Sequence, residues 1–524
     1  MLYIIYRIIF VALCIQLISG CGLFPKKLSD DFKIIEATID DVHNGIISKQ
    51  ITCYQLVERY IERIITYEHY NKLNAITKIN RQSKLRASEL DKEHQQTGEL
   101  RKLHCIPVIL KDNFDTADLP TEAGSIALKG SIPPNDAFVV KKLREAGAII
   151  IAKSNMAEWA FSPYETISST HGETKNAYNL NRVPAGSSGG TASAVAANYG
   201  IIGMGTDTGN SIRGPASHLS LVGIRATIGA ISRDGVVPLL FNRDVAGPMM
   251  RNVKDTARVF EVIAGYDRTD PGTEAGKGKI EKSYHRYLDE RGLVNARLGV
   301  MRELFMADDA DPEIIALMEA AIADLSYYGA VIIDNFTVPN FEELAKATGF
   351  CSRFRYDIDE YLKTLGDKAP VKNLKEVYDK KLFGEKSKGA MRWAMNVDTT
   401  PDRQEPPCID VENDPRRKAL KDAVLQAMQD QRIDAIIYPS WSNPPRMIGD
   451  SESPHGNNSP KIAPHTGQPA ITVPMGFTSD GLPAGLQFLG KPFFEGKLFQ
   501  YAYAYEQATL HRKPPLKFGR LSER

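Results

Sequence analysis

Two stretches of this chain have an apolar strand directly after an amphipathic helix. In the first, apolar side chains recur at helical spacing after Asp136, Gly147 ends the helix, and residues 148–152 are apolar without interruption. In the second, a helix that begins at Asp311 leads to another apolar run over residues 330–333. An unbroken apolar run indicates a strand buried on both faces, and helices that alternate with such strands favour an α/β fold. We therefore expect a sheet with helices packed against it.

The length and charge of the chain limit the number of domains and the kinds of partner that we expect. Its 524 residues, of which 43% are hydrophobic, suffice for a large core in one big domain or two smaller ones. Lysine and arginine number 65, and aspartate and glutamate number 64, so the net charge is +1. A nearly neutral protein lacks the positive field that attracts nucleic acid. We therefore expect no nucleic-acid partner.

The N-terminus is similar to an export signal. Arg7 precedes an apolar run that is short for a membrane span, and this run ends in Ile18-Ser19-Gly20-Cys21. These four residues resemble the lipobox of bacterial lipoproteins, in which the cysteine is lipidated and becomes the mature N-terminus. The resemblance implies a signal peptide over residues 1–20, lipidation of Cys21 and a tether over residues 21–31; the alternative is an uncleaved N-terminal anchor. We expect an exported, membrane-anchored protein of the cell envelope that faces the periplasm.

Four cysteines remain in the body of the chain: Cys53, Cys105, Cys351 and Cys408. In an oxidising compartment they could form two disulfides, with three possible connectivities. Their wide spacing matches neither a disulfide framework nor a metal site, so we expect separate buried thiols. The histidines likewise show no zinc-type spacing, and we expect no metal and no cofactor.

Two glycine-rich runs each contain a serine with catalytic potential. One run reads Pro184-Ala185-Gly186-Ser187-Ser188-Gly189-Gly190, and the other reads Gly205-Thr206-Asp207-Thr208-Gly209-Asn210-Ser211-Ile212-Arg213-Gly214-Pro215. Neither serine has a histidine or carboxylate beside it in the pattern of a usual serine hydrolase. Upstream, an apolar run over residues 106–110 ends at Lys111 and predicts a strand that carries this lysine into the interior. One buried lysine and two serines can form a proton relay that ends in an activated hydroxyl.

These three motifs resemble those of the amidase signature family, whose members hydrolyse or transfer amide groups through a Ser–Ser–Lys triad. Similar blocks recur between about residue 34 and residue 510. The resemblance implies the amidase signature fold, an α/β fold in which a large mixed β-sheet is flanked by α-helices on both faces. It also implies a single amidase domain over residues 32–515, with a variable specificity region at 366–466 and a C-terminal tail at 516–524.

The resemblance also implies the catalytic roles of three residues. Ser211 is the nucleophile, Ser187 is the relay and Lys111 is the base. Because a lysine with an ordinary pKa of about 10.4 is charged at neutral pH, burial must favour its neutral form. An oxyanion hole would be formed by the backbone N–H groups of the three residues before the nucleophile, Thr208, Gly209 and Asn210.

Other residues of the two runs support this site in the family. Asp207 and Arg213 match a supporting ion network, which is also compatible with a plain structural salt bridge. Ser188 competes with Ser187 for the relay role, but alignment of the two runs leaves Ser188 as a supporting hydrogen-bond partner. In the family the relay serine follows a cis non-proline peptide bond, which here would be Gly186–Ser187.

Three residues depart from the family pattern. Asn210 stands where most relatives have glycine, and Ala185 and Cys105 also replace glycines. Asparagine tolerates left-handed backbone better than most residues, so the nucleophile loop can keep its shape. Asn155 and Glu158 match another family block, and we interpret them as scaffold residues near the pocket. Because the triad is intact, we expect activity.

We predict an amide hydrolase that cleaves a carboxamide C–N bond through an acyl-enzyme and releases ammonia or an amine. The substrate would be a small-molecule or peptide amide; the sequence indicates neither which amide nor the oligomeric state. Some relatives pass ammonia to glutamyl-tRNA, but an exported lipoprotein would meet neither tRNA nor ATP. A Ser-His-Asp esterase that uses His171 or His218 is disfavoured, because the residues around Ser211 lack the Gly-x-Ser-x-Gly motif. The non-enzymatic alternative is a lipid-anchored binding protein for a small ligand.

Overall fold

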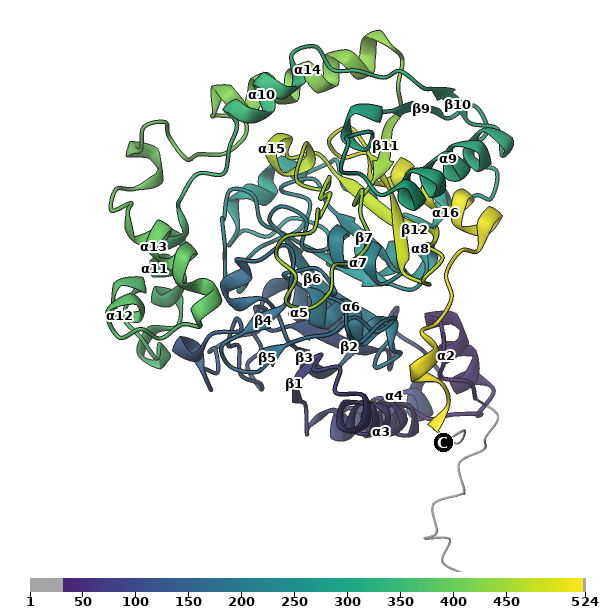
Figure 1. Cartoon of the computed structure of the whole chain (residues 1–524). Coiled ribbons are helices and arrows are strands. Elements are labelled where there is room, and N and C mark those ends of the chain that lie inside the picture. The colour runs from purple at the N-terminus through teal and green to yellow at the C-terminus, as the bar shows by residue number, and fades with distance from the viewer. Residues whose placement is uncertain (1–31, 522–524) are drawn as a thin grey trace, which may run out of the picture.

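The computed structural model describes residues 32–521, and one large β-sheet forms its centre (Figure 1). From one edge to the other its eleven strands are β1 (Ile76–Ile79), β3 (Ile149–Ser154), β2 (Pro107–Lys111), β6 (Ile202–Asp207), β8 (Val245–Met250), β7 (Val222–Arg225), β12 (Ala470–Phe477), β13 (Pro483–Leu489), β11 (Ala435–Pro439), β9 (Arg297–Val300) and β10 (Val331–Ile333). β2 runs parallel to β3 and β6, and β9 runs parallel to β10 and β11. The other neighbours are antiparallel. The sheet is therefore mixed, and the predicted α/β class is confirmed.

Helices flank this sheet on both faces, as the sequence predicted (Figure 1). In chain order they are α2 (Ile39–Ile47), α3 (Cys53–Asn71), α4 (Ser83–Thr97), α5 (Phe138–Glu145), α6 (Gly189–Ala196), α7 (Arg213–His218), α8 (Val253–Ile263), α9 (Pro312–Tyr327), α10 (Phe341–Ala347), α11 (Phe354–Thr364), α12 (Leu374–Asp379), α13 (Lys388–Met395), α14 (Pro415–Asp430), α15 (Ala463–Thr466) and α16 (Glu495–Thr509). α6 and α7 contact each other and pack on the central strands, whereas α8 contacts both α5 and α16. A separate two-stranded sheet pairs β4 (Ile167–Ser168) with β5 (Gly172–Glu173).

Small residues let α6 lie directly on the sheet. Every residue of this helix is buried, and its sequence consists of glycine, alanine, serine, threonine and one valine. On the facing strand β6, a Cβ added to Gly203 would lie 2.6 Å from Val195 Cγ2. A glycine on the strand and small side chains on the helix therefore bring the N-terminus of α6, which follows Ser187 and Ser188, close to β6.

The two helix-then-strand units have the predicted order but differ at their helix starts. Asp311 caps α9, because its carboxylate accepts hydrogen bonds from the first backbone N–H groups of the helix. Asp136 precedes the other helix and is of a residue type that can cap it, but this expectation was wrong: α5 starts at Phe138 and has no side-chain cap. The carboxylate of Asp136 forms an ion pair with Arg144 at 3.0 Å instead.

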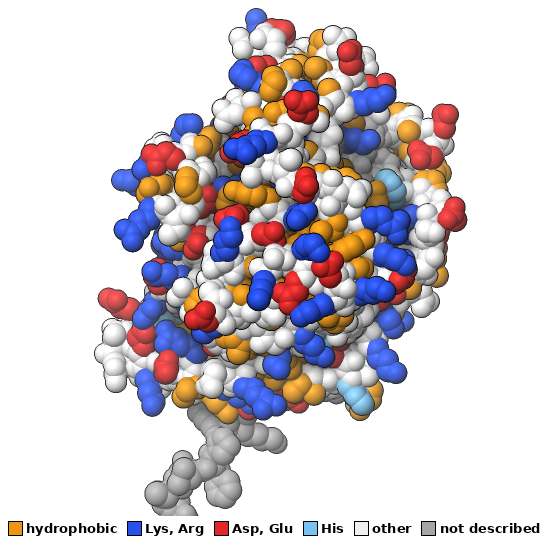
Figure 2. Space-filling model, turned by 90° about the vertical axis from the view of Figure 1, so that its left-hand side faces the viewer, with side chains coloured by type: hydrophobic (Ala, Val, Ile, Leu, Met, Phe, Trp, Pro, Cys, Tyr) orange, Lys and Arg blue, Asp and Glu red, His pale blue; other side chains and the backbone are white. Residues whose placement is uncertain are grey.

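Helices α11 to α13 form a lobe beside the sheet, on the left of Figure 1. The lobe has a small hydrophobic core of its own, which includes Trp159, Phe354, Ile358, Leu362, Leu374, Val377 and Met391. The segment 366–466, predicted to vary with specificity, includes part of this lobe but also the fully buried strand β11. On the face shown in Figure 2, acidic, basic and hydrophobic side chains are interspersed, and neither charge forms a continuous patch.

Two disulfides replace the separate thiols that the sequence predicted. Cys53 pairs with Cys105, and Cys351 pairs with Cys408, across 52 and 57 residues of chain. Such distant partners are brought together by the tertiary fold, so their spacing carries no signal. Within residues 32–521, one group of ligand-type side chains is close enough to hold a metal ion, Cys53, His104 and Cys105. Both sulfurs of this group are used in the disulfide.

Residues beyond 515, where the predicted domain ends, also pack against the rest of the protein. Phe518 is buried, and the carbonyl of Gly519 accepts hydrogen bonds from Arg63 and Tyr67 of α3. The predicted signal peptide, the lipidated Cys21 and the tether fall in residues 1–31, outside the described residues. Within residues 32–521, no helix is both long and apolar enough to cross a membrane.

Candidate active site

Lys111 is the last residue of β2 and is completely buried. Its Nζ atom lies 2.7 Å from Ser187 Oγ and 2.7 Å from Thr206 Oγ1. Burial lowers the pKa of Lys111 to about 7, although the nearby carboxylates of Asp244 and Asp207 act in the opposite direction. A lysine with a pKa near 7 is partly neutral at physiological pH and can accept a proton.

Ser187 lies in the loop that leads into α6, directly after a cis peptide bond from Gly186. The backbone is crowded there, and a Cβ on Gly186 would lie 2.4 Å from the carbonyl oxygen of Glu165. Ser188 has a different partner from its neighbour, because its Oγ donates to the carbonyl of Thr206 at 3.2 Å. The loop therefore presents Ser187, rather than Ser188, to the buried lysine.

Ser211 lies in the loop between β6 and α7 and is 4% exposed. Beside it, Asn210 Nδ2 donates to the carbonyls of Pro163 and Gly186, at 3.2 Å each. The bond to Gly186 fastens the loop of Ser211 to the loop of Ser187, and the bond to Pro163 fastens it to the segment before β4. No hydrogen bond joins the two serine side chains within the described part of the chain. In unliganded enzymes such contacts are often long and tighten only when substrate binds.

Free backbone donors precede Ser211. Arg213 Nη2 donates to the carbonyl of Gly209 at 2.7 Å. Because the C=O and N–H of one trans peptide point in opposite directions, the N–H of Asn210 points away from this arginine. Among residues 32–521, no hydrogen bond is donated by the N–H groups of Thr208, Gly209 or Asn210. Donors that are free in this way can bind an oxyanion.

A buried ion network supports the same loop. Asp207 pairs with Arg213 and with Arg225, both at 3.0 Å, and all three side chains are fully buried. Burial would raise the pKa of Asp207, but the two guanidinium groups outweigh it and lower the pKa to about 2. Arg213 also donates to the carbonyl of Ser459 and to the side chain of Gln487 on β13. The network therefore connects the nucleophile loop to the far half of the sheet.

A cavity of about 880 Å³ opens beside this loop. Phe350 and Pro460 belong to its wall, and a Cβ on Gly209 would lie 3.5 Å from the first and 3.7 Å from the second. The rest of the lining mixes apolar and charged side chains, among them Leu304, Phe341, Glu303, Glu342, Lys346 and Arg446. A concave, partly apolar site next to free N–H groups is typical of a substrate pocket.

The two histidines considered for a Ser-His-Asp site do not form one. Both ring nitrogens of His218 are buried without a hydrogen-bond partner, and burial lowers its pKa to about 3. The ring of His171 lies near Glu122, with Nδ1 4.0 Å from the carboxylate. In the described residues, neither ring is hydrogen-bonded to a serine. The geometry therefore favours the lysine-based site.

The two scaffold candidates lie in hydrogen-bond networks of their own. Glu158 accepts hydrogen bonds from the hydroxyls of Ser169 and Ser387 and so connects the β-hairpin region to the helical lobe. Asn155 Nδ2 donates to the carbonyl of Gly172 and the hydroxyl of Thr174.

Sequence reasoning missed three polar residues near the lysine. Thr206 Oγ1 accepts hydrogen bonds from Lys111 and from Asn113 Nδ2, at 2.7 and 3.1 Å. Asp244 accepts a hydrogen bond from Thr208 Oγ1, and burial raises the pKa of Asp244 to about 6. Thr206 belongs to the second glycine-rich run and Asn113 follows closely after Lys111, and these positions could have indicated both residues. Asp244 lies outside every motif and has no such signal.

Known proteins match this chain over nearly its whole length. Residues 55–499 match the Amidase family. A probable amidase of Arabidopsis thaliana is 34% identical over 511 residues, 93% of each chain. One subunit of the glutamyl-tRNA(Gln) amidotransferase of Syntrophus aciditrophicus is 33% identical over 496 residues, 92% of this chain and all of that protein. The X-ray structure of the peptide amidase from Stenotrophomonas maltophilia has a TM-score of 0.80 and 32% identity, covering 92% of this chain and 99% of that one.

The sequence and structural similarity to these relatives is consistent with the observed fold. The family match covers most of the chain, and the relatives above are more than 30% identical along more than nine-tenths of it. The mixed sheet flanked by helices is shared with the solved peptide amidase. This chain is an amidase-family hydrolase and belongs to the amidase signature family.

Proposed function

We propose that this enzyme hydrolyses an amide through a Ser211 nucleophile that Ser187 and Lys111 activate. One observation carries the proposal: the buried amine of Lys111 lies 2.7 Å from Ser187 Oγ, and burial lowers the pKa of the lysine to about 7. An amine that is neutral part of the time can take up a proton, which a charged ammonium group cannot.

In the acylation step, Ser211 Oγ attacks the carbonyl carbon of the amide. Its proton moves to Ser187 Oγ while the Ser187 proton moves to Lys111 Nζ. The carbonyl oxygen becomes an oxyanion and accepts hydrogen bonds from the free N–H groups of residues 208–210. These donors favour the charged intermediate over the neutral substrate, which is the condition for acceleration.

The intermediate then loses its nitrogen. The C–N bond breaks, the proton held by Lys111 returns through Ser187 to the departing nitrogen, and ammonia or an amine leaves. Water attacks the ester on Ser211 through the same relay, which releases the carboxylic acid and restores the serine. Protons and bonds balance over the cycle, and no cofactor is needed.

The substrate that we propose is a small-molecule or peptide amide. A cavity of about 880 Å³ has the size that surrounds a ligand of this kind. Among the solved relatives is a peptide amidase, whose structure is also known with the competitive inhibitor chymostatin. The likeness to that protein favours peptide amides as the first compounds to test.

A fluorophosphonate probe tests the triad without knowledge of the substrate. We expect intact-mass analysis and peptide mapping to find one adduct, on Ser211, that is lost in Ser211→Ala and suppressed in Lys111→Ala. The purified, folded protein without its N-terminal signal should then release ammonia from members of a panel of amides. A folded wild-type protein that forms no adduct would overturn the triad and favour the lipid-anchored binding protein.

We also propose that the protein is exported and anchored by a lipid on Cys21. The lipobox-like run Ile18-Ser19-Gly20-Cys21 and the two disulfides support this, because disulfides persist in oxidising compartments and are rare in the cytosol. Growth with an alkyne analogue of palmitate should label the wild-type protein in the cell envelope but not a Cys21→Ala variant. Equal labelling of the two proteins, or none of either, would contradict the anchor.

A further inference from the structure

Phe350 presents an exposed aromatic ring beside the proposed oxyanion hole. It belongs to the wall of the 880 Å³ cavity, and the residue is 44% exposed. A Cβ added to Gly209 would lie 3.5 Å from Phe350 Cζ, and Gly209 is the half-exposed member of an otherwise buried loop. A substrate whose carbonyl oxygen reaches the N–H groups of this loop therefore has its neighbouring atoms within reach of the Phe350 ring.

The Phe350 ring is held in place by Arg243 and His465. The guanidinium carbon of Arg243 lies 4.7 Å from the centre of the ring, and the ring centre of His465 lies 5.1 Å from it. Arg243 Nη2 also donates to the carbonyls of Thr348 and Gly349, at 2.9 and 2.8 Å. The buried arginine thus fixes both the ring and the backbone that precedes it.

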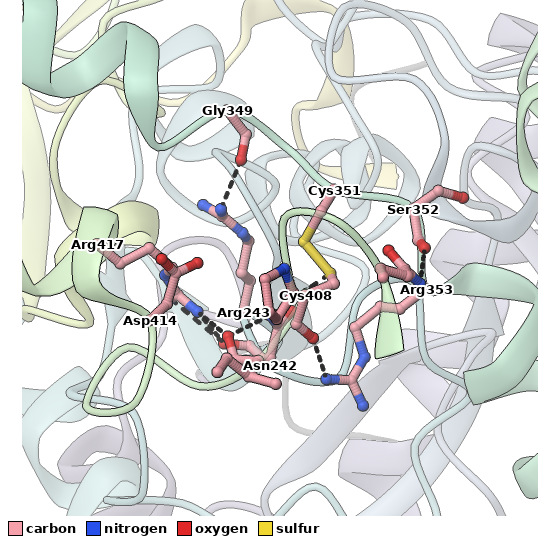
Figure 3. The surroundings of a disulfide bond; sticks show 12 residues. Asn242, Arg243, Gly349, Cys351, Ser352, Arg353, Cys408, Asp414 and Arg417 are labelled. Atoms are coloured by element: carbon pink, nitrogen blue, oxygen red, sulfur yellow. Dashed lines mark hydrogen bonds between the residues drawn. A yellow bond between two sulfur atoms is a disulfide. The ribbon is translucent and has the colours of Figure 1, made fainter. Parts of the chain in front are cut away.

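A covalent link fixes the backbone on the other side of Phe350. The next residue, Cys351, forms the disulfide with Cys408 (Figure 3). The partner segment is held in turn: Arg353 Nη1 donates to the carbonyl of Cys408 at 3.3 Å, and Asn242 Nδ2 donates to the following carbonyl at 2.9 Å. The short loop 348–353 is therefore tied down both before and after the aromatic ring.

Residues 242–244 contact both the loop of Phe350 and the loop that precedes Ser211. Arg243 holds the loop of Phe350, and the next residue, Asp244, accepts a hydrogen bond from Thr208 Oγ1. Asp244 also accepts hydrogen bonds from the backbone N–H groups of residues 239 and 240. Residues 242–244 therefore set the distance between the Phe350 ring and the proposed oxyanion hole.

We propose that Phe350 determines substrate specificity by packing against an apolar, preferentially aromatic, group next to the scissile amide, and that the Cys351–Cys408 disulfide positions it. This inference rests on the proposed function. Aromatic rings contribute much of the binding energy in ligand sites, because they bury a large area and stack on other rings. A ring that is fixed before binding also loses little conformational freedom when the ligand arrives.

Two amides that differ by a phenyl group test the role of the ring. The wild-type protein should hydrolyse phenylacetamide with a higher kcat/KM than acetamide. Phe350→Ala should lower this ratio by about tenfold to 100-fold, mainly through a higher KM for phenylacetamide, in the range typical of a lost apolar contact. Phe350→Tyr keeps the ring and should keep the ratio. An unchanged ratio in Phe350→Ala would overturn the inference.

The second disulfide is a control for testing whether the Cys351–Cys408 disulfide positions Phe350. Cys351→Ser/Cys408→Ser should lower the ratio of the two kcat/KM values, and should have no further effect in a Phe350→Ala background. Cys53→Ser/Cys105→Ser removes a disulfide that lies outside the cavity wall and should leave the ratio unchanged. Circular dichroism identifies a variant that has unfolded. Equal changes in both pairs, or no change in either, would overturn the positioning role.

Binding to a Ser211→Ala variant separates this inference from the proposed function, because no hydrolysis is needed. Calorimetric titration should show tighter binding of phenylacetamide than of acetamide, and the preference should vanish in Ser211→Ala/Phe350→Ala. That result supports the aromatic wall even if the wild-type protein hydrolyses neither amide. Equal affinities for the two amides would overturn the proposed role of Phe350, even if the fluorophosphonate probe labels Ser211.

Discussion

The proposed reaction centre and the cavity wall of this enzyme are built by different means. Lys111, Ser187 and Ser211 come from strands and loops in which almost every residue is buried. The wall includes Phe350, which is exposed and lies in the loop 348–353, where a disulfide holds the backbone. Close packing fixes the three proposed catalytic side chains, whereas a covalent bond and an arginine fix the loop that carries Phe350. We therefore expect that reactivity and selectivity can be changed separately in this fold.

Replacing Lys111 by methionine should have the largest effect on the reaction centre. Without its proton acceptor, Ser211 stays a weak nucleophile, and we expect its labelling rate with a fluorophosphonate to fall by about 10³-fold to 10⁴-fold. Lys153→Met is the matched control, because Lys153 is also fully buried but its Nζ donates to the Phe114 carbonyl and the Thr121 hydroxyl. An equal loss in both folded variants would show that a buried lysine is needed only for structure.

Thr206→Val should have the next largest effect, because it keeps the shape of the side chain but removes an acceptor that lies 2.7 Å from Lys111 Nζ. Leaving a buried donor unpaired costs about 1–3 kcal/mol, so kcat/KM should fall by about tenfold to 100-fold. The lost hydrogen bond had favoured charged Lys111, so the pH profile should also move to lower pH. A rate loss without this movement would indicate a packing defect only.

The pH dependence of the wild-type enzyme measures the same lysine directly. Only neutral Lys111 can accept a proton, and burial lowers its pKa to about 7. The labelling rate should therefore fall by about tenfold for each pH unit below the pKa and reach a plateau above it. Labelling measured between about pH 5 and pH 9 tests this, since the pKa lies inside that window. A flat profile, or a rate that falls as the pH rises, would contradict the role of the lysine.

Asn210 connects the two serine loops, and its removal should have the smallest effect of the four. Asn210→Gly deletes two hydrogen bonds at 3.2 Å and should lower kcat/KM by about tenfold and stability by about 1–2 kcal/mol. A Cβ on Gly214 would lie 2.6 Å from Asn210 Nδ2, so Gly214→Ala should be better tolerated once the asparagine is gone. Thermal unfolding of the single and double variants should give a coupling energy of about 0.5–3 kcal/mol. Strictly additive effects would mean that the two positions do not interact.

Local sequence patterns predicted much of the backbone around the three proposed catalytic residues. The apolar run before Lys111 indicated a buried strand, which β2 is, because a strand that is buried on both faces excludes polar residues. Ala185 and Cys105 stand where the family has glycine, and both have the left-handed backbone that glycine favours, with φ of 62° and 66°. The glycines of the family pattern therefore agree with the backbone shape at these two positions, although the residue itself has changed there.

The wall could not be predicted in the same way, because its contacts join distant parts of the chain. Cys351 and Cys408 belong to no motif, and their pairing follows only from the folded path of the residues between them. Arg243 and Asp244 lie outside the glycine-rich runs, and their partners are set by tertiary packing. Local sequence was also insufficient to predict the partner of Asp136. Its residue type suits a helix cap, but its carboxylate forms an ion pair with Arg144 instead.

The Cys53–Cys105 disulfide encloses α3, β1 and α4 in a covalent ring. The exposed residues 95–99, at and just after the end of α4, lie inside this ring. A protease that cuts the chain there opens the ring but releases no fragment, because sulfur still joins the two pieces. The nicked enzyme keeps its N-terminal helices on the strand that carries Lys111, and the pieces separate only when a thiol reductant and a denaturant act together.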